Sequence, residues 1–187
     1  MTKSKTICSL LVFSLTVGIG FAETFTGTTR IVPQTWVHST TGLTTVREVL
    51  PSSIFSWTHT SGTGANQMDQ LWHGAVTMTA SGTNTLDLTG GVTNSFGTVL
   101  TMAEVRLMVF TAAISNEDTV SIGGGPTAFY SFMNSTNDLL TIRPEGAIMF
   151  VAPDATGYAI GGGLLKFVNN SGVSNATVNV YIGASSS

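Results

Sequence analysis

The sequence has little charge of either sign. Charged side chains make up 9% of its 187 residues, and the net charge is −3, whereas ordinary soluble domains carry about 25% charged residues. The basic residues are spread along the chain, so no basic surface for phosphate groups is expected, and nucleic-acid binding is excluded from the predicted functions. Low charge together with a positive mean hydropathy also argues against intrinsic disorder.

The sequence also lacks the residue patterns of common catalytic and metal sites. It contains one cysteine, Cys8, and three histidines, His38, His59 and His73, none of them in a metal-binding HxH or HExxH arrangement. It contains no GxSxG, P-loop or GxGxxG motif. We therefore predict a protein that is not an enzyme, with no catalytic residues, no cofactor and no metal.

Threonine, serine and glycine are abundant instead, with thirty Thr, nineteen Ser and 21 Gly. Threonine suits half-exposed strand faces, and glycine suits turns. From residue 66 to the end, short apolar runs recur every 8–14 residues with turn residues between them. This spacing predicts an all-β domain at 66–187, an antiparallel β-sandwich or jelly roll of about eight strands. Residues 23–65 are rich in Thr and Ser and are predicted to form an extended N-terminal arm.

The first 22 residues have the layout of a secretory signal peptide. Two lysines in "MTKSK" precede the apolar run "TICSLLVFSLTVGIG", and small residues follow up to Ala22. A membrane anchor is the alternative, although sixteen helical residues span only about 24 Å of a hydrocarbon core about 30 Å thick. Cleavage near Ala22 would remove Cys8 and leave a cysteine-free body, which needs no oxidising compartment to fold.

The stretch "RPEGAIMFVAPDATGYAI", from Arg143 to Ile160, gathers three charged residues beside two prolines. Five extended residues would hold Glu145 and Asp154 about 17 Å apart, too far for paired-carboxylate chemistry at about 5–10 Å. We interpret the stretch as a turn, a strand of the buried type ("AIMFV") and a second turn in which Asp154 bonds backbone amides. The acidic run Asn116–Asp118 is interpreted as a solvated turn.

Three histidines follow tryptophans closely in the N-terminal part of the chain, in "WVH", "WTH" and "LWH". Aromatic side chains often anchor protein interfaces. Trp36, Trp57, Trp72 and His73 are therefore candidate interface residues. A carbohydrate-binding platform built on the same Trp–His pairs is a less favoured alternative.

Two segments resemble a known family. They are "GTGANQMDQLWHGAVTMTASGTNTLDLTGGVTNSFGTVLTMAEVRLMVF" at 62–110 and "RPEGAIMFVAPDATGYAIGGGLLKFVNNSG" from 143, followed by "ATVNVYIG". The "GTGA-x-Q-x-D-x-x-W" start, the "LDL-x-G…FG" unit and the "APDATGY" loop are similar to those of small β-rich proteins encoded in structural gene clusters of tailed phages and prophages. The resemblance implies a virion component and carries no catalytic residues.

We therefore expect a non-enzymatic virion structural protein, a decoration protein or a minor capsid or tail component. It would form homo-oligomers and contact other virion proteins, and it would touch a membrane only through residues 1–22 if these are retained. The alternative is a secreted or cell-surface subunit, cleaved near Ala22, that assembles with neighbouring subunits by β-strand addition. The signal-like segment favours this alternative, whereas the family resemblance favours the virion.

Overall fold

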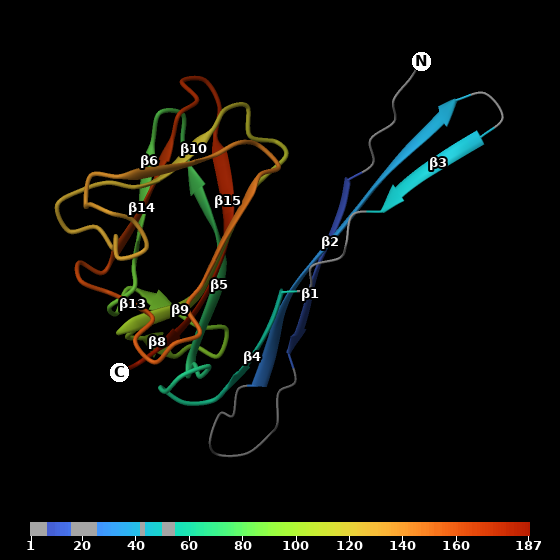
Figure 1. The fold of residues 1–187 in the computed structure, drawn as a ribbon. Helices are drawn as coiled ribbons and strands as arrows, with labels where there is room; N and C mark the ends of the chain where they lie inside the picture. Colours follow the sequence, from blue (N-terminus) through green and yellow to red (C-terminus); the bar gives the residue numbers. More distant parts are fainter. Residues whose placement is uncertain (1–6, 16–25, 42–43, 50–54) are drawn as a thin grey trace. The chain divides into compact units, whose positions relative to one another are not determined.

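The computed structural model describes residues 7–15, 26–41, 44–49 and 55–187, with side chains from Ser56 onward. The chain divides into two compact units, Met1–Thr60 and Ser61–Ser187. Every regular element in the described ranges is a β-strand, and the strands of each sheet pair antiparallel (Figure 1), which confirms the predicted all-β class. The same ranges hold no helix with the length and apolar character that a membrane crossing requires.

The first unit is organised around one long strand, β2 (Thr26–Thr41). β1 (Ile7–Leu15) and β4 (Phe55–Thr60) both pair with the first part of β2, and β3 (Thr44–Val49) pairs with its last six residues. β1 is the described part of the predicted signal segment, and the rest of residues 1–22 lies outside the described ranges. The arm expected at 23–65 is thus rich in strands, and the second unit begins slightly earlier than the predicted 66.

The second unit contains two main sheets. One has the strand order β12-β9-β15-β5, and the short strand β13 pairs with the first two residues of β9. The other has the order β11-β10-β14-β6. A small separate pair is formed by β7 and β8. The strands are β5 (Gln70–Met78), β6 (Thr83–Asp87), β7 (Val92–Thr93), β8 (Val99–Leu100), β9 (Glu104–Ala112), β10 (Val120–Gly123), β11 (Leu139–Ile142), β12 (Ala147–Val151), β13 (Tyr158–Ala159), β14 (Leu164–Asn169) and β15 (Ala176–Ser185).

The main strands of this unit pair in a nested order. The first strand, β5, pairs with the last, β15; β6 pairs with β14, β9 with β12, and β10 with β11. The chain is therefore one long hairpin whose pairs lie alternately in the two sheets. Because β15 also pairs with β9 and β14 also pairs with β10, the folded hairpin closes into two complete sheets.

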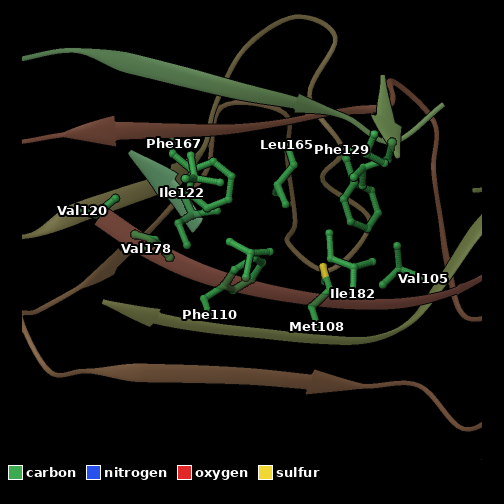
Figure 2. Close-up of a cluster of buried hydrophobic side chains, with 14 of the residues drawn as sticks. Val105, Met108, Phe110, Val120, Ile122, Phe129, Leu165, Phe167, Val178 and Ile182 are labelled. Carbon is green, nitrogen blue, oxygen red and sulfur yellow. The ribbon is translucent and has the colours of Figure 1, made fainter. Parts of the chain in front are cut away.

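The core lies between the two sheets, where β9 and β15 of one sheet face β10 and β14 of the other (Figure 2). Phe110 of β9 and Phe167 of β14 are both fully buried, and their rings meet edge-on with centroids 6.0 Å apart. Alternate residues of β15, such as Val178, Val180 and Ile182, are fully buried against them. This two-sheet core confirms the predicted antiparallel sandwich.

A β-bulge interrupts β9. Gly183 of β15 lies opposite Leu107, but Ala184 lies opposite Val105, so Arg106 is an extra residue on β9. The extra residue changes the alternation of side chains along the strand. Val105 therefore shares the core with Met108, although Leu107, which stands between them, does not belong to that cluster.

Two buried asparagines hold the loops at one end of the sandwich. Asn116 donates to the carbonyl of Thr177 (2.9 Å) and accepts from its N–H (2.8 Å). Asn169 donates to the carbonyls of Thr79 (2.9 Å) and Ser174 (2.7 Å). In the predicted solvated turn Asn116–Asp118, Glu117 and Asp118 are exposed as expected. Asn116 differs, since it is 5% exposed and bonds the backbone of Thr177 instead of water.

The segment "AIMFV" forms strand β12, as predicted, but it is not a buried strand. β12 pairs only with β9 and lies at the edge of its sheet. Ala147 is exposed, and the other four residues are half-buried. The composition matches a central strand because both faces of the strand are apolar, yet one backbone edge has no neighbouring strand in the described structure.

Candidate functional site

The most elaborate polar cluster in the described residues surrounds Arg106. Its side chain is 1% exposed and forms an ion pair with Glu104 (Nη2 to Oε2, 2.7 Å). The same Nη2 donates to the carbonyls of Thr63 (3.0 Å) and Ala155 (2.7 Å), and Nη1 donates to the carbonyl of Asp154. Both terminal nitrogens thus bind backbone oxygens from two loops far from Arg106 in the sequence.

The second of these loops, 152–157, has an internal framework of its own. Asp154 Oδ1 accepts hydrogen bonds from Gly157 N (2.7 Å), Thr156 N (2.8 Å) and Thr156 Oγ1 (2.9 Å), and these bonds lower the pKa of the exposed carboxyl. The predicted turn with Asp154 bonded to backbone amides is confirmed. Asn66 N also donates to the carbonyl of Pro153 (2.9 Å) and ties the first loop to the second.

Gly157 completes the cluster because a larger residue would not fit. Its φ is +55°, a left-handed conformation that costs an L-residue about 1–2 kcal/mol. A Cβ at this position would lie 2.9 Å from the carbonyl oxygen of Val105 and 3.0 Å from Arg106 Cδ. The loop can therefore close over Arg106 only with glycine here.

This arrangement supports structure and offers no chemistry. The guanidinium is enclosed, so an external anion cannot reach it, and its Nε is buried without a hydrogen-bond partner in the described structure. Its positive charge is balanced by Glu104 and by the three carbonyl oxygens. The cluster fastens the segments 62–66 and 152–157 to β9.

The predicted interface residues are divided between the two units, with Trp36 and Trp57 in the first and Trp72 and His73 in the second. Trp36 lies in β2 opposite Val49, and its side chain is outside the described part. Trp57 in β4 is half-buried. Trp72 packs against the core from β5, whereas the next residue, His73, is exposed on the other face of that strand.

The His73 ring contacts another aromatic ring on the outer face of its sheet. Its ring stacks on Tyr181 of β15 with centroids 6.0 Å apart and planes 23° apart. Ser95 Oγ lies 3.5 Å from His73 Nε2, and the residue after it, Phe96, is 71% exposed. His73 thus lies beside the aromatic ring of Tyr181 on this face.

His59 in β4 is buried, whereas His73, the other histidine whose side chain the structure describes, is exposed. It is 1% exposed, and neither ring nitrogen has a hydrogen-bond partner in that part of the chain. Burial lowers the pKa of the imidazole below its ordinary value of 6.5, because desolvation disfavours the charged form. His59 is consequently held neutral near pH 7.

Aromatic side chains fill the inner side of β12. The ring of Phe132, from the loop between β10 and β11, lies 5.1 Å from Phe150 of β12 and 5.0 Å from Phe129. Tyr158 of β13 lies edge-on to Phe150 at 6.3 Å. These rings hold β12 against the core by its inner face, so its position at the sheet edge is well supported.

No three His, Cys, Asp or Glu side chains gather as a metal site within the described ranges. Comparison of the chain with protein-family models, with curated proteins and with solved structures finds no match.

Proposed function

We propose that this chain is a non-enzymatic virion structural protein, a decoration protein or a minor capsid or tail component. The observation that carries the proposal is the cluster around Arg106. The "GTGA" segment and the "APDATG" loop, two parts of the resemblance to phage-encoded proteins, meet there and are fixed by hydrogen bonds from the Arg106 side chain to their carbonyls and by the bond from Asn66 N to Pro153 O. Residues that define the resemblance thus maintain the shape of the sandwich, as expected for a protein whose function is to present surfaces.

The strand connectivity gives independent support. We infer that the sandwich is a jelly roll, because a hairpin of four nested strand pairs, rolled so that β15 meets β9 and β14 meets β10, has this pairing. Jelly rolls occur in viral capsid domains and also in lectins. Fold alone does not decide function, so the proposal combines this connectivity with the resemblance.

An exported cell-surface or filament subunit is the second candidate. The 16-residue strand β2, in a unit separate from the sandwich, favours it, since residues 32–41 of β2 pair on one side only in the described structure and an unpaired strand edge can accept a strand from a neighbour. The signal-like segment fits the same interpretation.

The intact mass and N-terminus of the mature protein distinguish the two candidates. The protein is isolated both from purified phage particles and from the secreted fraction of the host culture. A chain that co-purifies with particles supports the virion role. A chain that begins near Glu23, occurs only outside the cell and is absent from particles contradicts it and supports the surface subunit.

A further inference from the structure

The edge strand β12 has the composition of a central strand. Its five residues, Ala147–Val151, include no charge, proline or glycine. Natural edge strands usually carry such residues because an unprotected edge invites pairing with another chain. Its half-buried side chains show that a typically buried sequence is only partly covered in the single chain.

The hydrogen bonds at the two ends of β12 show which residues face the free edge. Gly146 O accepts from Ala112 N (2.9 Å), and Ala152 N donates to Arg106 O (2.8 Å), both in the direction of β9. In an antiparallel pair the residues that bond the neighbour alternate along the strand. Ala147, Met149 and Val151 therefore direct their N–H and C=O groups away from β9.

The other edges of the two sheets are protected. On β5, the carbonyl of Thr77 accepts a hydrogen bond from Asn84 Nδ2 (3.1 Å), and on β6 the N–H of Thr85 donates to Asn84 Oδ1 (2.7 Å). β11 has only four residues, and Arg143 and Pro144 follow it directly. Side-chain hydrogen bonds, short length, charge and proline are recognised ways of blocking an edge. β12 has none of them within its own span.

We propose that the free edge of β12 binds β12 of a second copy of this chain, antiparallel, about a two-fold axis at Met149. In this register Met149 lies opposite Met149 of the other copy, and Ala147 lies opposite Val151. Each N–H of Ala147, Met149 and Val151 that points away from β9 then meets a C=O of the other copy. The two β12-containing sheets join into one continuous sheet, with a self-complementary interface of the kind that two-fold dimers use.

The flanking charges select this antiparallel arrangement. Arg143, before β12, is exposed and has no ion pair in the described structure. Asp154, after β12, is exposed, and its lowered pKa keeps it charged near neutral pH. Antiparallel pairing brings the start of one strand beside the end of the other, so Arg143 approaches Asp154 of the second copy.

The inference rests on the proposed assembly role and identifies the surface and the partner. The first test is sedimentation velocity of the full chain, of Met149→Lys and of the matched control Leu139→Lys. Leu139 is 54% exposed on β11, the edge strand of the other sheet. Two lysines facing each other across the axis repel, so Met149→Lys should weaken the dimer about tenfold or more. Leu139→Lys should leave the dimer unchanged, and thermal unfolding should confirm that both variants are folded.

A disulfide trap tests the register. Residues in a hydrogen-bonded antiparallel pair have Cα atoms about 5.5 Å apart, within the range that a disulfide spans. In a Cys8→Ser background, Met149→Cys should form a covalent dimer under mild oxidation. Leu139→Cys in the same background should stay monomeric on a non-reducing gel.

A monomeric wild-type chain, a dimer that tolerates Met149→Lys, or equal cross-linking of both cysteine variants would overturn the proposal. A dimer lost on deletion of residues 23–60 but insensitive to Met149→Lys would also overturn it and would assign the contact to the arm. The virion role is tested separately by particle fractionation, so a dimer found in a chain absent from particles leaves this interface intact and removes only that role.

Discussion

At the scale of single residues, Arg106 couples a buried charge to the position of two loops. Removing one partner of a buried, hydrogen-bonded ion pair typically costs about 3–5 kcal/mol, because the other charge remains buried without compensation. Replacing Arg106 would leave Glu104 and the carbonyls of Thr63 and Ala155 without the donor that they share.

We predict that Arg106→Ala lowers the free energy of unfolding by about 3–5 kcal/mol, measured by urea denaturation. The control is Arg143→Ala, an exposed arginine, which should change the value by less than about 0.5 kcal/mol. Equal effects of the two substitutions would mean that the carbonyl cluster does not depend on the guanidinium.

His59 should make stability depend on pH. Its pKa is lowered in the folded protein, so the folded state binds the proton less readily than the unfolded state does. The contribution of neutral His59 is complete above about pH 6.5 and is lost as the pH falls from there towards the lowered pKa. The urea midpoint of the wild type should therefore fall more between about pH 7.5 and pH 5 than that of His59→Leu. Parallel pH profiles for the two proteins would contradict this prediction.

Residue-level prediction from sequence succeeded where the interaction is local. Asp154 bonds residues two and three positions ahead, so turn chemistry alone identified it. Arg106 was missed because its carbonyl partners lie 43 to 49 positions away. The available signal was weak: a lone arginine within an apolar strand, two residues after a glutamate.

At the scale of elements, a side-chain pattern cannot show whether a strand has one neighbour or two. β9 and β12 are both largely apolar, but β9 lies between two strands and β12 between a strand and solvent. The bulge at Arg106 also breaks the simple alternation along β9, because it places Val105 in the core cluster that lacks Leu107 and Val109. A bulge is defined by the register with the partner strand, so the hydrophobic pattern of its own strand does not predict it.

The loop 152–157 provides a prediction at this scale. Gly157→Ala should destabilise the protein by about 2 kcal/mol or more, from the left-handed backbone and the contact with Val105 O. The matched control is Gly161→Ala in the same connection, because a Cβ there has no heavy atom within 4 Å. Thermal unfolding of both variants compares them, and hydrogen exchange at Thr156 and Gly157 shows whether the loop has opened.

At the scale of the whole molecule, the sandwich forms its sheets without any strand from the preceding residues. Each of its strands pairs with another strand between Ser61 and Ser187. The all-β class and the antiparallel pairing followed from composition and turn spacing. The division between the units at Thr60 did not, because Thr63 and Asn66 join the sandwich through backbone groups, which sequence patterns do not report.

We therefore predict that residues 61–187, expressed alone, fold cooperatively. The measurements are near-UV circular dichroism and the coincidence of thermal transitions followed by two probes. A fragment that binds hydrophobic dyes and lacks a cooperative transition would show that the first unit is required for folding.

The nested strand pairing also has a consequence in time. β15 is the last of the sandwich strands to be synthesised, yet it stands between β5 and β9, so the sheet that contains it cannot be completed before β15 has left the ribosome. The pairing of the first strand with the last is the most distant closure in the unit, and distant closures fold slowly. Of the nested pairs, only the innermost, β10 with β11, can form early. A nascent chain of this protein thus passes through a long interval with exposed strands, in which a chaperone or a secretion channel could still bind it in extended form.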